Sequence, residues 1–349
     1  MIPLAAQTAD CLTFRTGPGL ECVPAPAPQP PQPGMLQVRP LQVIFGSLDR
    51  AMLAGKEGSE GVVGRGGVFV VSGVGAGVEP GLVGSRVVVD AAWGCGKCSL
   101  CRGGIAYLCP DRTCPGLRSP GGRGVGLACP DVQIPAAVAA VVPPEIGNDA
   151  AAIAQTFAGA IHAVRTALID SKQYVTILGD GPIAVLTAII ASQSCPGVRL
   201  LGKHPERFGL LERVGIPHRH LAEVGKRGDQ HVVIDCTGDS SGLAVAASLL
   251  APRGRLVIKT APNISNEAMS AEGAAVQRLA SIEATVVGAG AGYVRDAISL
   301  LRKRSIDVGL VISRHITPAG AGGLLDLLLD SRNMLVSVDW RGDVGGSKA

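Results

Sequence analysis

Four cysteines lie within one short, glycine-bearing segment, in the order C-x2-C-x2-C-x7-C. Four thiolates can close a tetrahedron around Zn²⁺ at about 2.3 Å each. The short spacings let one loop supply every ligand, and four protein ligands leave no open coordination position. The segment therefore predicts one structural zinc per chain, with an iron–sulfur cluster or a set of free thiols as the alternative interpretations. The predicted ligands are Cys95, Cys98, Cys101 and Cys109.

A glycine motif in the second half of the chain has the spacing of a phosphate-binding turn. It reads Gly179-x-Gly181-x-x-Ala184 and lies between a segment with strand character and an apolar helix that begins with Pro182 and Ile183. In that context Gly179 allows the tight turn and Gly181 lets the backbone approach a pyrophosphate, while the helix N-terminus attracts the phosphates. The motif predicts a dinucleotide site, and an ordinary glycine turn is the alternative.

The residues after the next predicted strand bear on which dinucleotide is bound. NAD sites usually place Asp or Glu here, where the carboxylate accepts a hydrogen bond from the ribose 2′-OH. This chain has Gly202 instead, followed by Lys203, His204 and, one helical step on, Arg207. Because the carboxylate is missing and cations are added, the segment suits a 2′-phosphate, and NADP(H) is favoured over NAD(H). Solvated surface charges are the alternative interpretation.

The elements that must position these motifs can be predicted from the hydrophobic pattern. Up to about residue 145 the chain consists of short β segments broken by Gly and Pro, whereas apolar strands alternate with helices from about residue 148. Such alternation is typical of a doubly wound parallel sheet, so the predicted fold class is α/β. Strands are expected at 36–39, 68–72, 86–90, 174–178, 198–201, 231–235, 255–259 and 284–287, and helices at 148–169, 183–194, 207–214, 241–250 and 293–304.

The composition excludes several classes of protein. Of 349 residues, 47% are hydrophobic and 17% are charged, which provides a sizeable core and rules out general disorder. A net charge of +4 is too small and too dispersed to indicate a nucleic-acid partner. No apolar run reaches the ~18 uncharged residues that a membrane helix needs, and residues 1–10 lack the pattern of a secretory signal. We therefore expect neither nucleic acid nor membrane as a partner, and a cytoplasmic location.

The cysteine segment resembles a known zinc lobe. The residues from Gly94 to Cys101, together with Leu108-Cys109-Pro110, are similar to the structural-zinc lobe of zinc-containing alcohol dehydrogenases, which are medium-chain dehydrogenases/reductases. The similarity extends over nearly the whole chain and includes Ile161-His162-Ala163-Val164, the Gly179 turn and Cys236-Thr237-Gly238.

The resemblance implies two domains and a set of partners. A GroES-like catalytic domain is expected at residues 1–146 and 289–349, with its zinc lobe at 94–110, and a Rossmann domain at 147–288. The resemblance places Thr237 near the adenosine side of a nicotinamide cofactor and Thr260 near the nicotinamide. It also implies a homodimer or homotetramer that pairs Rossmann edge strands within residues 255–287, and a small-molecule substrate whose identity the sequence does not give.

The residues that hold a catalytic zinc in this family have no counterparts here. The family uses a Cys, a His and a third Cys, Asp or Glu, but the matching positions carry Gly46, Arg65-Gly66 and Gln155. A shift of the alignment does not restore the ligand set, since all six histidines lie at residue 162 or later. We therefore predict that the catalytic zinc is absent, because none of these side chains is a thiolate, an imidazole or a carboxylate. The histidines are His162, His204, His218, His220, His231 and His315.

Without a catalytic zinc, another group must polarise the substrate oxygen. The candidates near the predicted cleft are Ser47, Asp49, Lys56 and Arg65. The sequence thus predicts an NADP(H)-dependent, alcohol dehydrogenase-like oxidoreductase that transfers hydride to or from a small carbonyl, alcohol or activated alkene. The alternative is a non-catalytic relative that binds NADP(H) and structural zinc as a sensor or assembly component.

Overall fold

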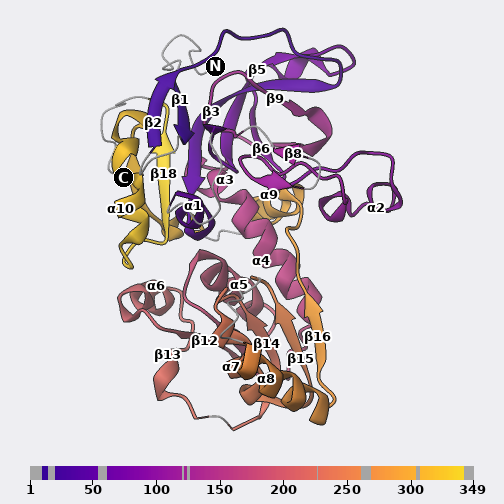
Figure 1. Cartoon of the computed structure of the whole chain (residues 1–349), viewed down its shortest axis with the longest axis vertical. Coiled ribbons are helices and arrows are strands. Elements are labelled where there is room, and N and C mark those ends of the chain that lie inside the picture. Colours follow the sequence, from indigo (N-terminus) through magenta and orange to yellow (C-terminus); the bar gives the residue numbers. More distant parts are fainter. Residues whose placement is uncertain are drawn as a thin grey trace. The chain divides into compact units, whose positions relative to one another are not determined.

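The chain divides into two compact units, which are described separately here (Figure 1). The first unit comprises residues 1–155 and 292–349, and the second comprises residues 156–291. The structure, a computed structural model, describes residues 10–14, 20–53, 61–119, 122–123, 126–225, 227–260, 269–303 and 307–341.

A sheet of seven described strands forms the centre of the first unit. Its order is β10-β6-β5-β3-β18-β17, and β9 also pairs with β3. The C-terminal strand β18 runs antiparallel to β3, with Val338 opposite Val43, so the end of the chain returns to the N-terminal part. The strands are β3 Met35–Phe45, β5 Gly67–Val74, β6 Arg86–Val89, β9 Val132–Pro135, β10 Ala139–Val141, β17 Ile312–Ile316 and β18 Leu335–Asp339.

Smaller elements surround this sheet. One three-stranded sheet has the order β2-β1-β4, and β7 pairs with β8. The core is built mainly from Val, Ile and Leu, together with the fully buried rings of Phe45, Phe69 and Trp340. The remaining strands are β1 Asp10–Phe14, β2 Leu20–Pro24, β4 Gly61–Val62, β7 Arg118–Ser119 and β8 Gly122–Arg123, and the helices are α1 Ser47–Leu53, α2 Ser99–Arg102, α3 Asn148–Ala152, α9 Val294–Lys303 and α10 Leu324–Leu329.

The second unit contains a six-stranded sheet in the order β13-β12-β11-β14-β15-β16, in which every pairing is parallel. The chain proceeds outward from β11 in one direction and returns to β14 on its other side. The strand order therefore reverses beside β11, where dinucleotides bind in such sheets. The strands are β11 Val175–Leu178, β12 Val198–Gly202, β13 His218–His220, β14 Gln230–Asp235, β15 Leu250–Ile258 and β16 Thr285–Gly288.

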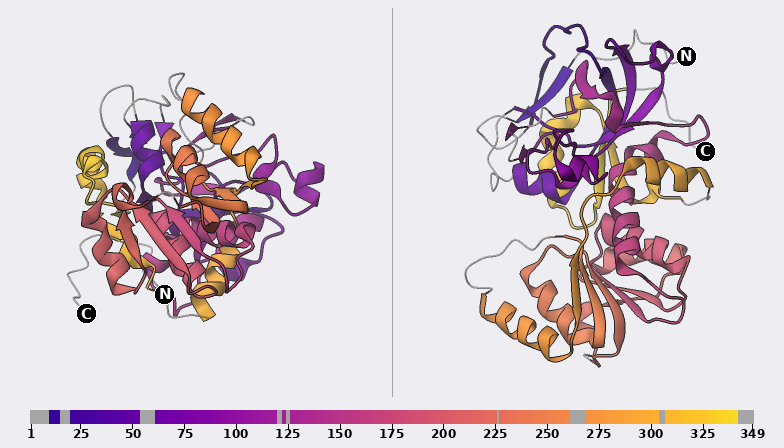
Figure 2. Two further views of the ribbon diagram at one scale, coloured as in Figure 1. Left: turned by 90° about the horizontal axis from the view of Figure 1, so that it is seen from below. Right: turned by 90° about the vertical axis from the view of Figure 1, so that its right-hand side faces the viewer.

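Helices cover both faces of this parallel sheet (Figure 2). The central strands are continuous apolar runs because both faces are covered, and all four residues of β11 are buried. In α5 every residue from Ala184 to Ala191 is buried, which matches the apolar helix expected at 183–194. The helices are α4 Ala154–Ala167, α5 Pro182–Ser192, α6 Phe208–Arg213, α7 Ser240–Leu249 and α8 Met269–Ser281.

The predicted α/β class and parallel sheet are confirmed, and the elements for which no range was predicted include β13, α1 and α8. Strand β13 has the sequence His-Arg-His and lies at the sheet edge, so it carries no apolar alternation. Helices α1 and α8 were also missed. In the described part of the chain, none of the helices has the length and apolar character needed to cross a membrane.

Candidate nucleotide and metal sites

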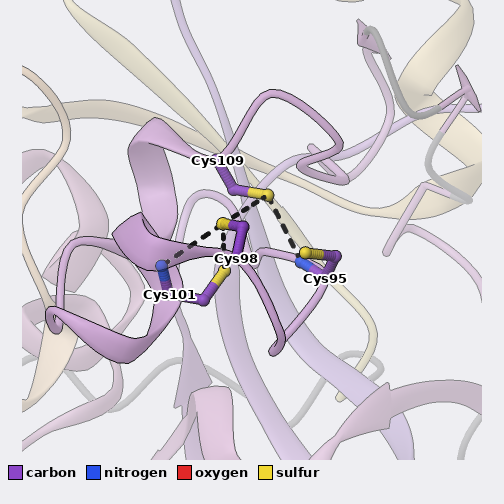
Figure 3. A group of neighbouring side chains, drawn as sticks. All are labelled: Cys95, Cys98, Cys101 and Cys109. Carbon is purple, nitrogen blue, oxygen red and sulfur yellow. Dashed lines mark hydrogen bonds between the residues drawn. The ribbon is translucent and has the colours of Figure 1, made fainter.

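The four cysteines of the predicted zinc lobe converge (Figure 3). Their sulfur atoms all lie within 4.8 Å of one another. Cys98 Sγ lies 3.4 Å from Cys101 Sγ and 3.7 Å from Cys109 Sγ. Thiolates at 2.3 Å from a tetrahedral zinc are separated by about 3.8 Å, so the cluster has the dimensions of a zinc site.

The loop backbone is shaped around these sulfurs. Cys98 caps the N-terminus of α2, where its sulfur accepts a hydrogen bond from Cys101 N at 3.4 Å. Hydrogen bonds from the backbone N–H groups of Lys97 and Cys98 lower the pKa of Cys95 to about 7, whereas desolvation raises the pKa of Cys101 to about 12. A Cβ on Gly94 would lie 2.4 Å from Cys101 Sγ, so only glycine fits there. Four thiolates at this spacing repel one another, and a divalent cation would relieve that repulsion.

Tyr293, from the C-terminal part of the chain, supports the same lobe. Its hydroxyl accepts a hydrogen bond from Ala106 N at 3.1 Å and donates to Gly104 O at 2.6 Å. Its ring packs edge-to-face on Tyr107, with centroids 5.4 Å apart. Sequence reasoning missed this residue because nothing in its local sequence indicates a partner almost 190 positions away.

Of the four candidate groups near the missing zinc ligands, two come together, Asp49 and Arg65. Asp49 lies on α1 and is only 4% exposed. One of its carboxylate oxygens accepts from Gly46 N at 2.8 Å, and the other accepts from Arg65 Nε at 3.2 Å. Ser47 is exposed at the start of α1. Lys56 lies outside the described residues.

Gln155 packs beside Arg65 and Gly66, the second of the segments matched to the catalytic-zinc site. Its amide nitrogen donates to Arg65 O at 2.8 Å and to Val89 O at 2.9 Å. A Cβ on Gly46 would lie 2.9 Å from Leu335 Cδ2, so that position is also closely packed. The positions that the resemblance assigns to zinc ligands are therefore occupied by an ion pair, an amide and two glycines.

The glycine motif in the second unit forms the predicted turn between β11 and α5. Gly179 has a φ of +105°, in the left-handed region, and its N–H donates to Leu201 O at 2.8 Å. A Cβ on Gly181 would meet nothing within 4 Å, so the backbone is open to a ligand at that point. No side chain caps the N-terminus of α5, which begins with Pro182 followed by Ile183. These are the properties of a turn that accepts a pyrophosphate.

The three side chains predicted to contact a 2′-phosphate, those of Lys203, His204 and Arg207, all contact carboxylates. Lys203 Nζ lies 2.9 Å from Asp239 Oδ2. Asp180, the middle residue of the glycine motif, takes the other two: His204 Nδ1 and Arg207 Nη1 each lie 2.9 Å from its Oδ1. The backbone N–H groups of Lys203 and His204 donate to Asp180 Oδ2 at 2.5 and 2.8 Å.

Asp180 is a buried carboxylate at the predicted nucleotide site that sequence reasoning did not single out. Its side chain is 6% exposed. Burial alone would raise the pKa of Asp180, but the His204 side chain and the two backbone N–H groups outweigh burial and hold that pKa below its ordinary value. Gly202 is the sequence signal for this position of Asp180, because a Cβ on residue 202 would lie 2.6 Å from Asp180 Oδ2.

Further polar groups lie at the carboxyl ends of β14 and β15. Thr237 donates through both N and Oγ1 to Asp235 Oδ1, at 2.9 and 2.6 Å. Thr260 N lies 3.3 Å from Asp235 O, so both predicted threonines are at one edge of the sheet. Lys259, which was not predicted, donates to Gly290 O at 2.7 Å. Burial lowers the pKa of Lys259.

Comparison with known proteins agrees with this architecture. The sequence matches no model of a protein family. It is 31% identical over 207 residues to L-threonine 3-dehydrogenase of Mesorhizobium japonicum, which covers 58% of this chain and 57% of that protein. The enzyme of Rhizobium etli is 30% identical over 181 residues and half of each chain. The chain thus spans about half the length of the curated relatives it matches.

Solved structures match over a larger part of the chain. An alcohol dehydrogenase from Escherichia coli in complex with NADH has a TM-score of 0.83 at 19% identity, covering 95% of this chain and 98% of that one. A protein described as a zinc-binding dehydrogenase, from Sinorhizobium meliloti and bound to NADP, has a TM-score of 0.79 at 21% identity, with the same coverage. Galactitol-1-phosphate dehydrogenase from Escherichia coli has a TM-score of 0.82 at 17% identity, covering 95% and 99%. The chain therefore has the fold of these dehydrogenase structures and has dehydrogenases among its relatives in sequence, which confirms the predicted resemblance.

Proposed function

We propose that this protein is a nicotinamide-dependent oxidoreductase of the alcohol dehydrogenase type. The observation that carries the proposal is the turn at Gly179 to Pro182, which lies where the strand order reverses and exposes an uncapped helix N-terminus beside an open Gly181. The curated relatives, which are dehydrogenases, support it. The cofactor would supply the hydride, so the protein's task is to bind, orient and polarise.

The proposed substrate is a small carbonyl, alcohol or activated alkene, handled without a catalytic zinc. The donor set supports this, because Gly46, Arg65 and Gln155 offer no thiolate, imidazole or carboxylate. Of the candidate donors, we propose Arg65 as the group that donates to the substrate oxygen. Its Nε is held by Asp49, and the rest of the guanidinium still carries donors and a positive charge. Asp49 accepts hydrogen bonds from Gly46 N and from Arg65 Nε, and it thereby positions Arg65.

The proposed cofactor is NADP(H), which we expect to bind slightly more tightly than NAD(H). Gly202 supplies no carboxylate for a ribose 2′-OH, and three cations gather at the end of β12. Two carboxylates already neutralise part of that charge, which reduces the advantage of a 2′-phosphate. The cations are Lys203, His204 and Arg207.

The Cys95 cluster is proposed to hold one structural zinc. The sulfur spacing and the glycine at residue 94 fit the ion, and all four ligands come from the protein. Bound zinc would hold the lobe together and would have no position for substrate.

We also propose a homodimer or homotetramer in the cytoplasm, as in the sequence-based expectation. The sheet of the second unit ends at β16, and Val286 on that edge strand is 45% exposed. An unpaired edge of this kind can pair with a second copy. Light scattering on the purified protein tests the assembly, and a monomer at all concentrations would contradict it.

A turnover assay tests the proposed activity. The protein is incubated with NADPH or NADH and a panel of aldehydes, ketones, quinones and enones, and cofactor oxidation is recorded at 340 nm, with NADP⁺ and alcohols for the reverse direction. Turnover of any member supports the proposal. Tight cofactor binding with no turnover across the panel would favour the alternative, a non-catalytic relative that binds NADP(H) as a sensor or assembly component.

A further inference from the structure

The donors around Asp180 have the composition of an anion-binding site. Two consecutive backbone N–H groups, from Lys203 and His204, point at one carboxylate. The His204 ring and the Arg207 guanidinium approach the same group at 2.9 Å. Successive backbone N–H groups combined with an Arg are a recurring way to bind phosphate and other anions.

The Asp180 carboxylate has no capacity left for a ribose hydroxyl. A carboxylate offers about four lone-pair positions. Four donors already occupy them, and the side chain is only 6% exposed. Asp180 therefore does not replace the Asp or Glu that usually follows the second strand and accepts from the 2′-OH. Its carboxylate occupies a site whose hydrogen-bond donors suit an anion.

The Asp180 carboxylate can occupy its position because residue 202 is a glycine. A Cβ on Gly202 would lie 2.6 Å from Asp180 Oδ2 and 2.7 Å from Asp180 Cβ. A side chain at the end of β12 is therefore incompatible with this position of Asp180. Residue 202 itself carries no carboxylate, and the carboxylate of Asp180 in the glycine turn lies beside it. That turn is the segment proposed to bind the pyrophosphate.

We propose that Asp180 is an internal competitor for the 2′-phosphate of NADP(H) and thereby sets the protein's choice of cofactor. The carboxylate occupies the anion site at the end of β12, and it must leave before a 2′-phosphate can accept from the same donors. This inference rests on the proposed function, because it assumes a dinucleotide on the Gly179 turn. It predicts that removal of the carboxylate strengthens binding of 2′-phosphorylated nucleotides selectively.

The test compares 2′,5′-ADP (adenosine 2′,5′-bisphosphate) with 5′-AMP, which differ only in the 2′-phosphate and need no hydride transfer. Dissociation constants are measured by calorimetry for the whole protein and for Asp180→Ala. Because charge-assisted hydrogen bonds become available to the phosphate, we expect 2′,5′-ADP to bind about tenfold more tightly or better, with the affinity for 5′-AMP changed less than threefold.

A matched control distinguishes a local effect of the Asp180 carboxylate from a general effect of the protein's net charge. Glu212→Gln removes the same charge from an exposed carboxylate of the second unit, whose partner is His218 at 3.9 Å. We expect it to change the 2′,5′-ADP affinity less than threefold. An equal gain in both variants would overturn the proposal, because simple loss of negative charge would then explain the effect.

Folding and nucleotide binding are checked independently. If Asp180→Ala is unstable, Asp180→Asn removes the charge at nearly constant volume, and inorganic phosphate should raise its melting temperature more than that of the unmodified protein. Binding of 5′-AMP with an unchanged affinity for 2′,5′-ADP would overturn this inference alone. Failure of every form to bind either nucleotide would overturn the proposed function, and this inference with it.

Discussion

The Gln155 side chain occupies the space that any side chain at residue 66 would need. A Cβ on Gly66 would lie 2.4 Å from both Cδ and Oε1 of Gln155. The amide uses its nitrogen to join Arg65 O to Val89 O, so it links the chain just before β5 to the end of β6. Residue 66, which the resemblance matches to the Glu of the family's His-Glu pair, is thus closed off by a structural contact.

Gln155→Ala should destabilise the first unit. The change leaves two partly buried backbone carbonyls without a donor, and we expect the free energy of unfolding to fall by about 1–3 kcal/mol. Denaturant unfolding measures the change. Gln133→Ala is the matched control, because its amide nitrogen also donates to two carbonyls, Gln29 O and Pro30 O, in exposed positions. A loss in the control as large as that at Gln155 would contradict the assigned role.

Much of this architecture was predictable because local patterns encode it. Strand β11 is a short apolar run, since both faces of a parallel sheet are covered, and the cysteine spacing fits within a single loop. The contacts that define the sites were not predictable. The bonds from Asp180 to Arg207 and from Gln155 to Val89 join residues 27 and 66 positions apart, and only the folded chain brings them together.

Replacing one thiolate of the zinc lobe should destabilise the first unit and leave the second largely unchanged. Cys98→Ser removes a predicted ligand and replaces the sulfur that caps α2. We expect the unfolding temperature of the first unit to fall by roughly 5 °C or more, and a strong chelator to have the same effect on the unmodified protein. Scanning calorimetry, with metal removal confirmed, measures both.

Cys114→Ser is the control for this prediction, because Cys114 is a free, partly buried cysteine outside the four-sulfur cluster. It should shift the unfolding temperature by less than about 2 °C. If chelation and Cys98→Ser both leave the transition unchanged, the lobe does not depend on a metal.

Arg65→Ala should reduce turnover if Arg65 polarises the substrate oxygen. Loss of one such donor typically lowers kcat by about 10²-fold or more. KM for the cofactor should stay within about threefold, because the residue is assigned to the substrate and not to the nucleotide. Arg50→Ala is the control, since Arg50 is an exposed neighbour on α1. Equal kcat values for Arg65→Ala and the unmodified enzyme would exclude this role.

Lys203→Ala should weaken NADPH binding more than NADH binding. Lys203 is paired with Asp239, and both side chains are nearly half exposed, so its contribution to phosphate binding is modest. We expect a loss of about three- to tenfold for NADPH and less than twofold for NADH. Fluorescence titration of the two reduced cofactors measures this. Parallel losses for both cofactors would show that Lys203 does not recognise the 2′-phosphate.

The protein should contain one zinc ion per chain. A catalytic zinc needs about three protein ligands and an open position. Among the described residues, Asp49 supplies the carboxylate that contacts Gly46, and it is already bonded to Gly46 N and to the positively charged Arg65. Moving Zn²⁺ from water into such a site would be strongly unfavourable, because a fixed positive charge opposes it and few ligands replace its hydration shell. Elemental analysis of dialysed protein should therefore give one zinc, and Cys98→Ser should give less. Two tightly held ions per chain, or ethanol oxidation abolished by a chelator that leaves the fold intact, would show that a catalytic zinc is present and that the ligand positions were wrongly assigned.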